Sequence, residues 1–136
     1  MTSRFTFGKK ERLTQNLLIG KLFTDGSSFN LNPFKVFYLE HNNPYDFAAR
    51  ILIAVPSKKF KHAVDRNRLK RLIRESYRLN KQPLLDHLHQ ASLKIHVGFV
   101  FISNSAEIEF TEVEKKMIFC IEKLILILKE DSKGKF

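Results

Sequence analysis

The order of hydrophobic patterns between residues 34 and 102 constrains the fold most. Two runs rich in β-forming residues, 34–40 and 47–55, flank an Asn-Asn-Pro turn, so the second run reads as the strand returning from the first. Apolar residues at helical spacing follow at 66–80, and a third β-rich run covers 93–102. Strands and helices in this order predict helices packed on a small sheet.

Two further helices complete the pattern. Residues 10–25 form a helix that Gly26 ends in a DGSS turn, and a final helix opens at Thr111, with Glu114 at capping-box spacing, and runs to about Lys129. The predicted fold class is α+β: an α-β sandwich of order α-β-β-α-β-α with a mostly antiparallel sheet of three or four strands. At 136 residues the chain suits one domain. That domain spans 1–136, with flexible ends at about 1–9 and 130–136.

The first helix is apolar on more than one side. At 100° per residue, its apolar residues point in three directions, as the pairs Leu13 and Leu17, Leu18 and Leu22, and Ile19 and Phe23. Such a helix either lies deep in the protein or uses a second face for something else.

Positive charge is concentrated in one region. The chain has 24 Lys and Arg against 14 Asp and Glu, which gives a net charge of +10. Residues 56–81 hold ten Lys or Arg and two acids, a local charge of +8, whereas residues 104–136 hold six Lys and seven acids, a local charge of −1. A surplus of this kind favours a polyanionic partner, either nucleic acid or an acidic membrane surface.

The helix predicted at 66–80 carries most of this surplus. Asp65 is its expected N-cap, and Pro83 closes it. Its apolar edge consists of Leu69, Leu72, Ile73 and Ser76, with Arg66 and Tyr77 at the border, and a broad cationic face lies opposite. Neighbouring like charges repel by a few tenths of a kcal/mol per pair, and a solvated face usually mixes signs. Phosphate groups are the natural partners of such a face.

Several other functions are excluded. Cys120 is the single cysteine, so we expect a buried structural thiol and neither a disulfide nor a cysteine-based zinc site. The N-terminus lacks a signal-peptide core, and the longest apolar stretch is too short to span a bilayer, so we expect a cytoplasmic protein without a membrane partner.

The acids Asp65 and Glu75 are too few for the metal site of a metal-dependent nuclease. His87 and His89 lack a third ligand. We therefore predict no catalytic residue and no metal site in the protein itself.

The run SKKFKHAVDRNRLKRLIRESYR, residues 57–78, resembles the signature of the bacterial ribonuclease P protein subunit. The hallmark of that family is an Arg-Asn-Arg triplet opening a basic helix, which stands here at 66–68. The likeness extends more loosely from about Lys9 to Lys129. Pro56 departs from the pattern, because the family usually has a small polar residue there.

This resemblance implies a function. In the family a large RNA is the catalyst, and the protein assists it in the endonucleolytic removal of the 5′ leader from precursor tRNA. Magnesium ions are bound mainly by that RNA. The resemblance also implies a left-handed βαβ crossover. The expected partners are the catalytic RNA and precursor tRNA. Positions that match the family's RNA-binding residues are Lys58, Lys59, Arg66, Asn67, Arg68, Lys70, Arg71, Arg74 and Arg78, and those of its leader-binding cleft are Ile19, Phe23 and Phe37.

Two alternatives use the same charge. A helix-turn-helix protein would place the basic helix in a DNA groove, but residues 55–65 read as strand and loop rather than as the required preceding helix, so no DNA partner is expected. A ribosomal or ribosome-assembly protein would need rRNA phosphates for the same reason. Only the Arg-Asn-Arg helix in its context separates this second alternative from ribonuclease P.

Overall fold

The computed structural model describes residues 7–133, with side chains as far as Asp131. Of the predicted flexible ends, about 1–9 and 130–136, residues 1–6 and 134–136 lie outside the described residues. In chain order, the elements are η1 (Lys9–Glu11), α1 (Asn16–Asp25), β1 (Ser27–Leu31), β2 (Phe34–His41), β3 (Ala49–Ala54), α2 (Ala63–Asn80), α3 (Gln82–Ala91), β4 (Lys94–Phe101) and α4 (Phe110–Lys133).

One four-stranded mixed sheet forms the centre, with strand order β1-β2-β4-β3. β1 pairs antiparallel with β2, β2 pairs antiparallel with β4, and β3 pairs parallel with β4. The expected α+β class and the mostly antiparallel sheet are confirmed. The returning strand is in a different place from the prediction, because β4 lies between β2 and β3.

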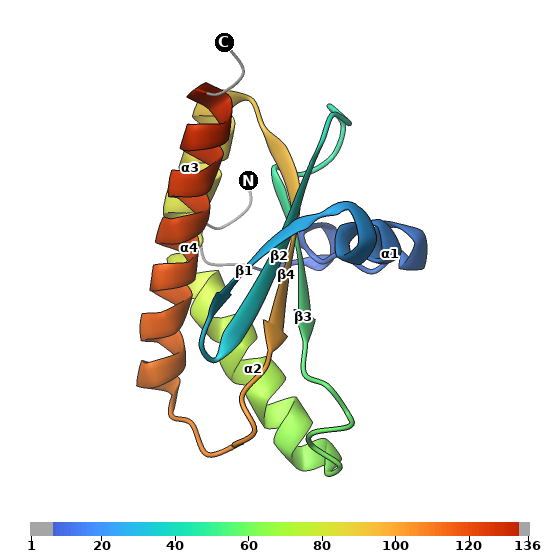
Figure 1. Ribbon diagram of the computed structural model, residues 1–136, viewed down its shortest axis with the longest axis vertical. Helices are drawn as coiled ribbons and strands as arrows, with labels where there is room; N and C mark the ends of the chain where they lie inside the picture. Colours follow the sequence, from blue (N-terminus) through green and yellow to red (C-terminus); the bar gives the residue numbers. More distant parts are fainter. Residues whose placement is uncertain (1–6, 134–136) are drawn as a thin grey trace.

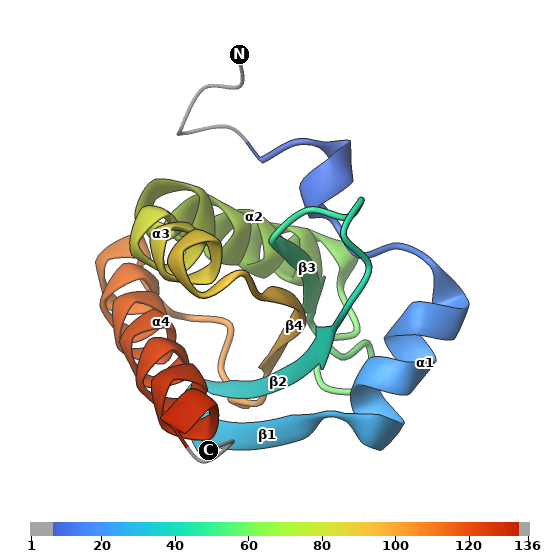
Figure 2. The ribbon, with the colours of Figure 1, turned by 90° about the horizontal axis from the view of Figure 1, so that it is seen from above.

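The helices lie in two layers on opposite faces of the sheet. α2, α3 and α4 cover one face, and α1 covers the other (Figures 1 and 2). In Figure 2, β3 and β4 run away from the viewer, and the chain passes from β3 through α2 and α3 to β4 counterclockwise. The βαβ crossover is therefore left-handed, against the strong general preference for the right-handed form. Sequence periodicity carries no information on this handedness.

The core lies between the sheet and the layer of α2, α3 and α4. Because side chains alternate along a strand, Phe34 and Val36 of β2 and Val97 and Phe99 of β4 face these helices and are fully buried. Cys120 of α4 is also fully buried, as predicted, and burial raises the pKa of its thiol to about 12. Within the described residues, no helix combines the length and the apolar character that a membrane span needs.

The first helix begins later than expected, at Asn16 instead of Lys10. The preceding segment pairs with the edge of the sheet, since Arg12 forms a parallel bridge with Ile51 and the Leu13 N–H donates to the Ile51 carbonyl at 2.9 Å. Gly26 ends the helix as predicted. A Cβ there would lie only 2.3 Å from the Leu22 carbonyl oxygen, so no larger residue fits without movement.

Two further elements and three boundaries differ from the prediction. β1 and α3 were not foreseen, and Pro83 stands in the first turn of α3, where its missing N–H costs no helical hydrogen bond. α2 begins at Ala63, so its N-cap is His62 and Asp65 lies in its first turn. The Asp65 N-cap prediction was therefore wrong. α4 starts at Phe110 and stays helical to Lys133, beyond the expected end at about Lys129.

Candidate nucleic-acid interface

One narrow edge of α2 packs into the core. Leu69, Ile73 and Tyr77 are fully buried, and the buried Ser76 hydroxyl donates to the Ile73 carbonyl at 2.7 Å. Leu72 is half-buried at the margin of the same cluster. The predicted apolar edge is thus confirmed, and it extends to Tyr77, which periodicity placed at the border. The remaining circumference of α2 carries the predicted cations.

The nine positions matched to RNA binding all lie on α2 or on the β3–α2 loop before it. This loop and the first turns of α2 form the end of the molecule at the bottom of Figure 1. The nine side chains differ in how their donors are used. Some hold neighbouring loops or pair with acids, and the others have no partner among the described residues.

Arg68 holds the segment that leads into α4. Its two terminal nitrogens donate to the carbonyl oxygens of Ala106 and Ile108, both at 2.8 Å. The bonds are partly buried and join positions about forty residues apart in the chain. The guanidinium of Arg68 is therefore fixed in position, and it also stabilises the β4–α4 connection.

Arg66 and Lys59 fix the β3–α2 loop. One terminal nitrogen of Arg66 donates to the carbonyl of Phe60 at 2.6 Å and to that of Lys61 at 3.0 Å. The Lys59 ammonium donates to the Ile102 carbonyl at 2.7 Å. These contacts hold the loop against the start of α2 and against the end of β4. Basic side chains here therefore serve the local structure as well as the surface charge.

Acidic side chains compensate two cations of the basic region. Arg78 pairs with Glu75 one turn before it, and its hydrogen bond lowers the pKa of the Glu75 carboxyl. Lys81, which contributes to the local +8, is buried, and its ammonium lies 2.7 Å from a Glu11 carboxylate oxygen. Lys81 thus joins α2 to η1 and adds no charge to the surface.

Five matched positions have no hydrogen bond or ion pair within residues 7–133. Lys58, Asn67 and Arg71 are exposed, whereas Lys70 and Arg74 are half-buried. The Arg74 Nε is buried without a hydrogen-bond partner among the described atoms. The unpartnered positions are Lys58, Asn67, Lys70, Arg71 and Arg74.

Arg12 adds a cation that sequence reasoning missed. It lines the same small pocket as Arg74, between α2 and the edge strand β3, and its guanidinium lies 5.4 Å from the centre of the Phe7 ring. The parallel bridge between Arg12 and Ile51 brings it there. Because the predicted first helix includes Arg12, no local pattern indicated that Arg12 lies beside Arg74.

Aromatic side chains gather on the opposite face of the sheet, under α1. The rings of Phe23 and Phe37 meet edge to face, with centroids 4.8 Å apart and an interplanar angle of 81°. The Lys35 ammonium lies 5.2 Å from the centre of the Phe37 ring. Phe23 remains 39% exposed, and the half-buried Ile19 lies one turn before it on α1. We call Ile19, Phe23, Lys35 and Phe37 the aromatic surface.

The register of β2 decides which aromatic residue reaches this surface. Phe37 pairs with Gly98 of β4 and faces α1, whereas Tyr38 points to the other face and packs against Phe29. Gly98 lets α1 approach the sheet, because a Cβ there would lie 3.2 Å from a Leu22 methyl group. The structure thus brings together the three residues expected at the leader-binding cleft.

The acidic residues of α2 do not form a metal-binding pair. Asp65 and Glu75 stand ten positions apart, about three helical turns, and Glu75 is engaged by Arg78. Divalent magnesium in proteins usually needs one or two carboxylates facing a shared site. The described residues of α2 therefore do not fit a magnesium ion.

Comparison with known families gives a direct result. The family model described as Ribonuclease P matches residues 7–125 of the chain. The ribonuclease P protein component of Porphyromonas gingivalis (strain ATCC 33277) is 39% identical over 122 residues, which covers 86% of each chain. The corresponding protein of Chlorobium phaeobacteroides is 43% identical over 82 residues, which covers 56% of this chain and 54% of the relative.

Solved structures have the same fold. The RNase P protein of Staphylococcus aureus superposes with a TM-score of 0.64 at 22% identity, covering 84% of this chain and 94% of that one. The RNase P protein of Thermotoga maritima superposes with a TM-score of 0.63 at 23% identity, covering 83% of this chain and 96% of that one. At this level of identity the similarity establishes the fold.

Proposed function

Because the chain belongs to the ribonuclease P protein family, we propose that it binds the catalytic RNA of ribonuclease P and the 5′ leader of precursor tRNA. In this role it assists the endonucleolytic removal of the leader, which gives tRNA its mature 5′ end. The observation that carries the proposal is the broad cationic face of α2, which is packed rigidly on one edge and lacks acidic partners at most of its positions.

The contacts with the catalytic RNA are assigned to α2 and the loop before it. Lys58, Asn67, Lys70, Arg71 and Arg74 have donors available for phosphates, and Asn67 reaches backbone groups without adding charge. Lys59, Arg66 and Arg68 hold the loops and keep further N–H groups for RNA. Arg78 lies at the margin of this surface and shares its charge with Glu75. Preorganised donors lose little conformational entropy on binding, which supports this assignment.

The aromatic surface is assigned to the single-stranded leader. A base can stack on the exposed part of Phe23 or on Phe37, and the Lys35 ammonium lies close enough to meet the neighbouring phosphate. Stacking of a base on an aromatic ring contributes about 1–3 kcal/mol and accepts any base, as leaders of varied sequence require. Ile19 offers apolar contact without stacking.

The chemistry is assigned to the RNA subunit. In this proposal magnesium ions are bound mainly by RNA, in agreement with the poor fit of the α2 acids to such an ion. The protein contributes positioning, through phosphate contacts on α2 and leader contacts on the aromatic surface. Family membership does not favour the alternative of a ribosomal protein.

Salt dependence of RNA binding tests the role of α2. Log affinity for bacterial ribonuclease P RNA should fall linearly with log salt, with a slope of about 0.7–0.9 per phosphate contact. The double variant Lys70→Ala/Arg71→Ala should lower that slope by about two contacts. The matched control Lys115→Ala/Lys129→Ala removes the same charge from α4 and should leave the slope unchanged. Equal losses in both double variants would contradict a specific interface on α2.

Preference for precursor over mature tRNA tests the aromatic surface. Phe23→Ala should reduce this preference by about 1–3 kcal/mol per stacked base and spare binding of the catalytic RNA. Phe47→Ala is the matched control, because Phe47 is 40% exposed against 39% for Phe23 but lies in the β2–β3 connection. A similar loss for precursor and mature tRNA in Phe23→Ala would assign Phe23 a purely structural role.

A further inference from the structure

Two histidines and an aspartate meet at one end of the sheet, on the sheet face that also carries Phe37. His41 ends β2, His96 lies in β4, and Asp46 lies in the connection from β2 to β3. His41 pairs with Lys94 in the β2–β4 ladder, so His96, two residues further along, shares its face of the sheet. The side chains are only 18%, 5% and 11% exposed for His41, His96 and Asp46.

The three side chains converge on one point. The Nε2 atoms of His41 and His96 each lie 3.4 Å from the same Asp46 oxygen, Oδ2. One potential ligand atom from each residue falls within 4.8 Å of the other two. The imidazole rings are tilted against each other, with centroids 4.2 Å apart and an interplanar angle of 36°. Three side chains of two types that bind transition metals, imidazole and carboxylate, therefore share a small, nearly dry space.

Hydrogen bonding accounts for only part of this arrangement, through one long hydrogen bond of 3.4 Å between His96 Nε2 and Asp46 Oδ2. A good N–H···O bond spans about 2.7–3.2 Å, and both contacts with Asp46 are longer. The His41 Nε2 is buried without a hydrogen-bond partner among the described atoms. Buried polar atoms are rarely left unsatisfied, and each exception needs an explanation. An ion between the three groups would satisfy this nitrogen.

Two of the three ligand separations, those from each histidine to Asp46, fit tetrahedral zinc. With Zn–N and Zn–O bonds of about 2.0–2.2 Å, two ligand atoms at the tetrahedral angle lie about 3.4 Å apart. An octahedral ion with bonds of similar length would bring neighbouring ligands to about 3.0 Å. Both measured His–Asp separations are 3.4 Å. Two imidazoles and one carboxylate also form the type of ligand set found in zinc sites with an open fourth position.

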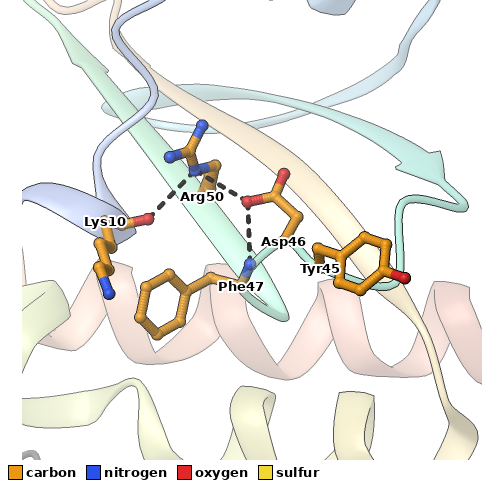
Figure 3. Close-up of a pocket in the computed structure, with 5 residues that line it drawn as sticks. All are labelled: Lys10, Tyr45, Asp46, Phe47 and Arg50. Carbon is orange, nitrogen blue, oxygen red and sulfur yellow. Dashed lines mark hydrogen bonds and ion pairs between the residues drawn. The ribbon is translucent and has the colours of Figure 1, made fainter.

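Neighbouring groups hold the carboxylate in place. The other oxygen of Asp46, Oδ1, accepts a hydrogen bond from the Phe47 N–H at 2.8 Å and forms an ion pair with Arg50, whose Nε lies 3.0 Å away (Figure 3). Arg50 is itself fixed, since it donates to the Lys10 carbonyl at 3.1 Å and to the Gln15 side chain. Oδ2 is thereby left to face the histidines. Outer contacts of this kind orient the ligands in metal sites.

Burial favours the neutral form of the His41 side chain, because it lowers the pKa of that imidazole. The neighbouring His96 lowers this pKa further, as do the positive charges of Lys94 and Arg50, whereas Asp46 raises it. A neutral imidazole offers the lone pair that a metal needs. The same two cations oppose a divalent ion, so we expect weaker binding than in a closed four-ligand structural site.

We propose that His41, Asp46 and His96 form a zinc-binding site that joins the β2–β3 connection to β4. The fourth position is open to water. Ligation through the His41 Nε2 places the remaining ring proton on Nδ1, which now accepts a long hydrogen bond of 3.3 Å from the Asn43 N–H. That bond must break, so the turn at Asn43 moves when the ion binds.

Metal titration of the full-length protein tests this proposal. We expect calorimetry to show one saturable Zn²⁺ site, and Co²⁺ in its place to give the intense visible absorption of tetrahedral coordination. His41→Gln and Asp46→Asn should each weaken binding by on the order of a hundredfold, at the upper end of what even outer contacts cost. His89→Gln, an exposed histidine of α3, is the control and should bind normally. The Asn43 amide resonance should shift on zinc addition in the wild-type protein and in His89→Gln, but not in His41→Gln or Asp46→Asn.

Two outcomes would contradict the proposal of a zinc site. Absence of saturable Zn²⁺ binding by the wild-type protein would mean that the three groups are held by packing alone. Unchanged affinity in both His41→Gln and Asp46→Asn would place the ion elsewhere. Circular dichroism and melting of each metal-free variant establish that it is folded, and His41, the most exposed of the three residues, decides the question if the Asp46 variant does not fold.

Discussion

α2 and α4 pack on the same face of the sheet and against each other, yet their surfaces differ completely in charge. α2 carries six Lys or Arg and two acids, whereas α4 carries five Lys and five acids. Both bury an apolar edge, with Ile73 of α2 and Leu124 of α4 fully buried. Packing on this sheet therefore does not require positive charge, and the bias of α2 must serve another purpose.

The polar contacts of the two helices show the same difference. The Asn80 side chain of α2 donates a hydrogen bond of 3.0 Å to the Glu114 carboxylate of α4. An acidic residue of α4 is therefore used in a contact with α2. Lys123 of α4 lies 4.9 Å from the centre of the Phe29 ring and is used locally. On α2, Arg71 has no such contact within the described residues. A surplus of positive charge is thus a property of α2, not of long helices in this protein.

The largest expected effect is a loss of stability when a core residue of either helix is truncated. Equal losses would show that α2 and α4 contribute equally to the core. Ile73→Ala and Leu124→Ala should each lower the free energy of unfolding by about 2–5 kcal/mol, because both remove a fully buried branched side chain. Urea denaturation measures both values. A loss below about 1 kcal/mol in only one of them would mean that the two helices do not contribute equally to the core.

A smaller effect separates two types of cation on α2 itself. Arg68→Ala removes two partly buried hydrogen bonds to the β4–α4 segment and should cost about 1–3 kcal/mol of stability. Arg71→Ala should change stability by less than about 0.5 kcal/mol, since Arg71 is exposed. Both should weaken binding of ribonuclease P RNA. If Arg68→Ala left stability unchanged, the loop-anchoring role of Arg68 would be wrong.

The smallest expected effect is a change in RNA affinity when the ion pair between Glu75 and Arg78, near the end of α2, is removed. Glu75→Gln removes the charge that pairs with Arg78 and should tighten RNA binding by about twofold, the scale of a single surface ion pair on a helix. Glu122→Gln on α4 is the matched control, because Glu122 is an exposed acid of the balanced helix. Equal tightening in both variants would indicate a general effect of net charge.

Local patterns predicted the elements that periodicity can define. The buried edge of α2 and the strand at 34–40 both follow from the spacing of side chains. β1 was missed because SSFNL reads as the end of a turn, and its strand character comes from pairing with β2. α3 was missed because Pro83 was taken only as a stop signal. Strand order and crossover handedness depend on contacts between distant segments, which no local pattern encodes.

The functional sites also differ in whether local sequence patterns could predict them. The cationic face could be predicted because its residues share one helix, and the family resemblance supplied the aromatic positions. His41, Asp46 and His96 appeared scattered, because their proximity depends on the β2–β4 register and on a connection of irregular structure. Arg12 was missed for a similar reason, since its bridge to Ile51 replaced the expected helix. Sites assembled from several segments need the tertiary structure.

The most direct test of the central claim is cleavage by the reconstituted complex. Bacterial ribonuclease P RNA is mixed with this protein at low magnesium, and release of the 5′ leader from precursor tRNA is followed. The wild-type protein and the Lys115→Ala/Lys129→Ala variant of α4 should both stimulate cleavage strongly, whereas Lys70→Ala/Arg71→Ala should stimulate it weakly. Absence of stimulation by the folded wild-type protein, or equal stimulation by both double variants, would contradict the role assigned to α2.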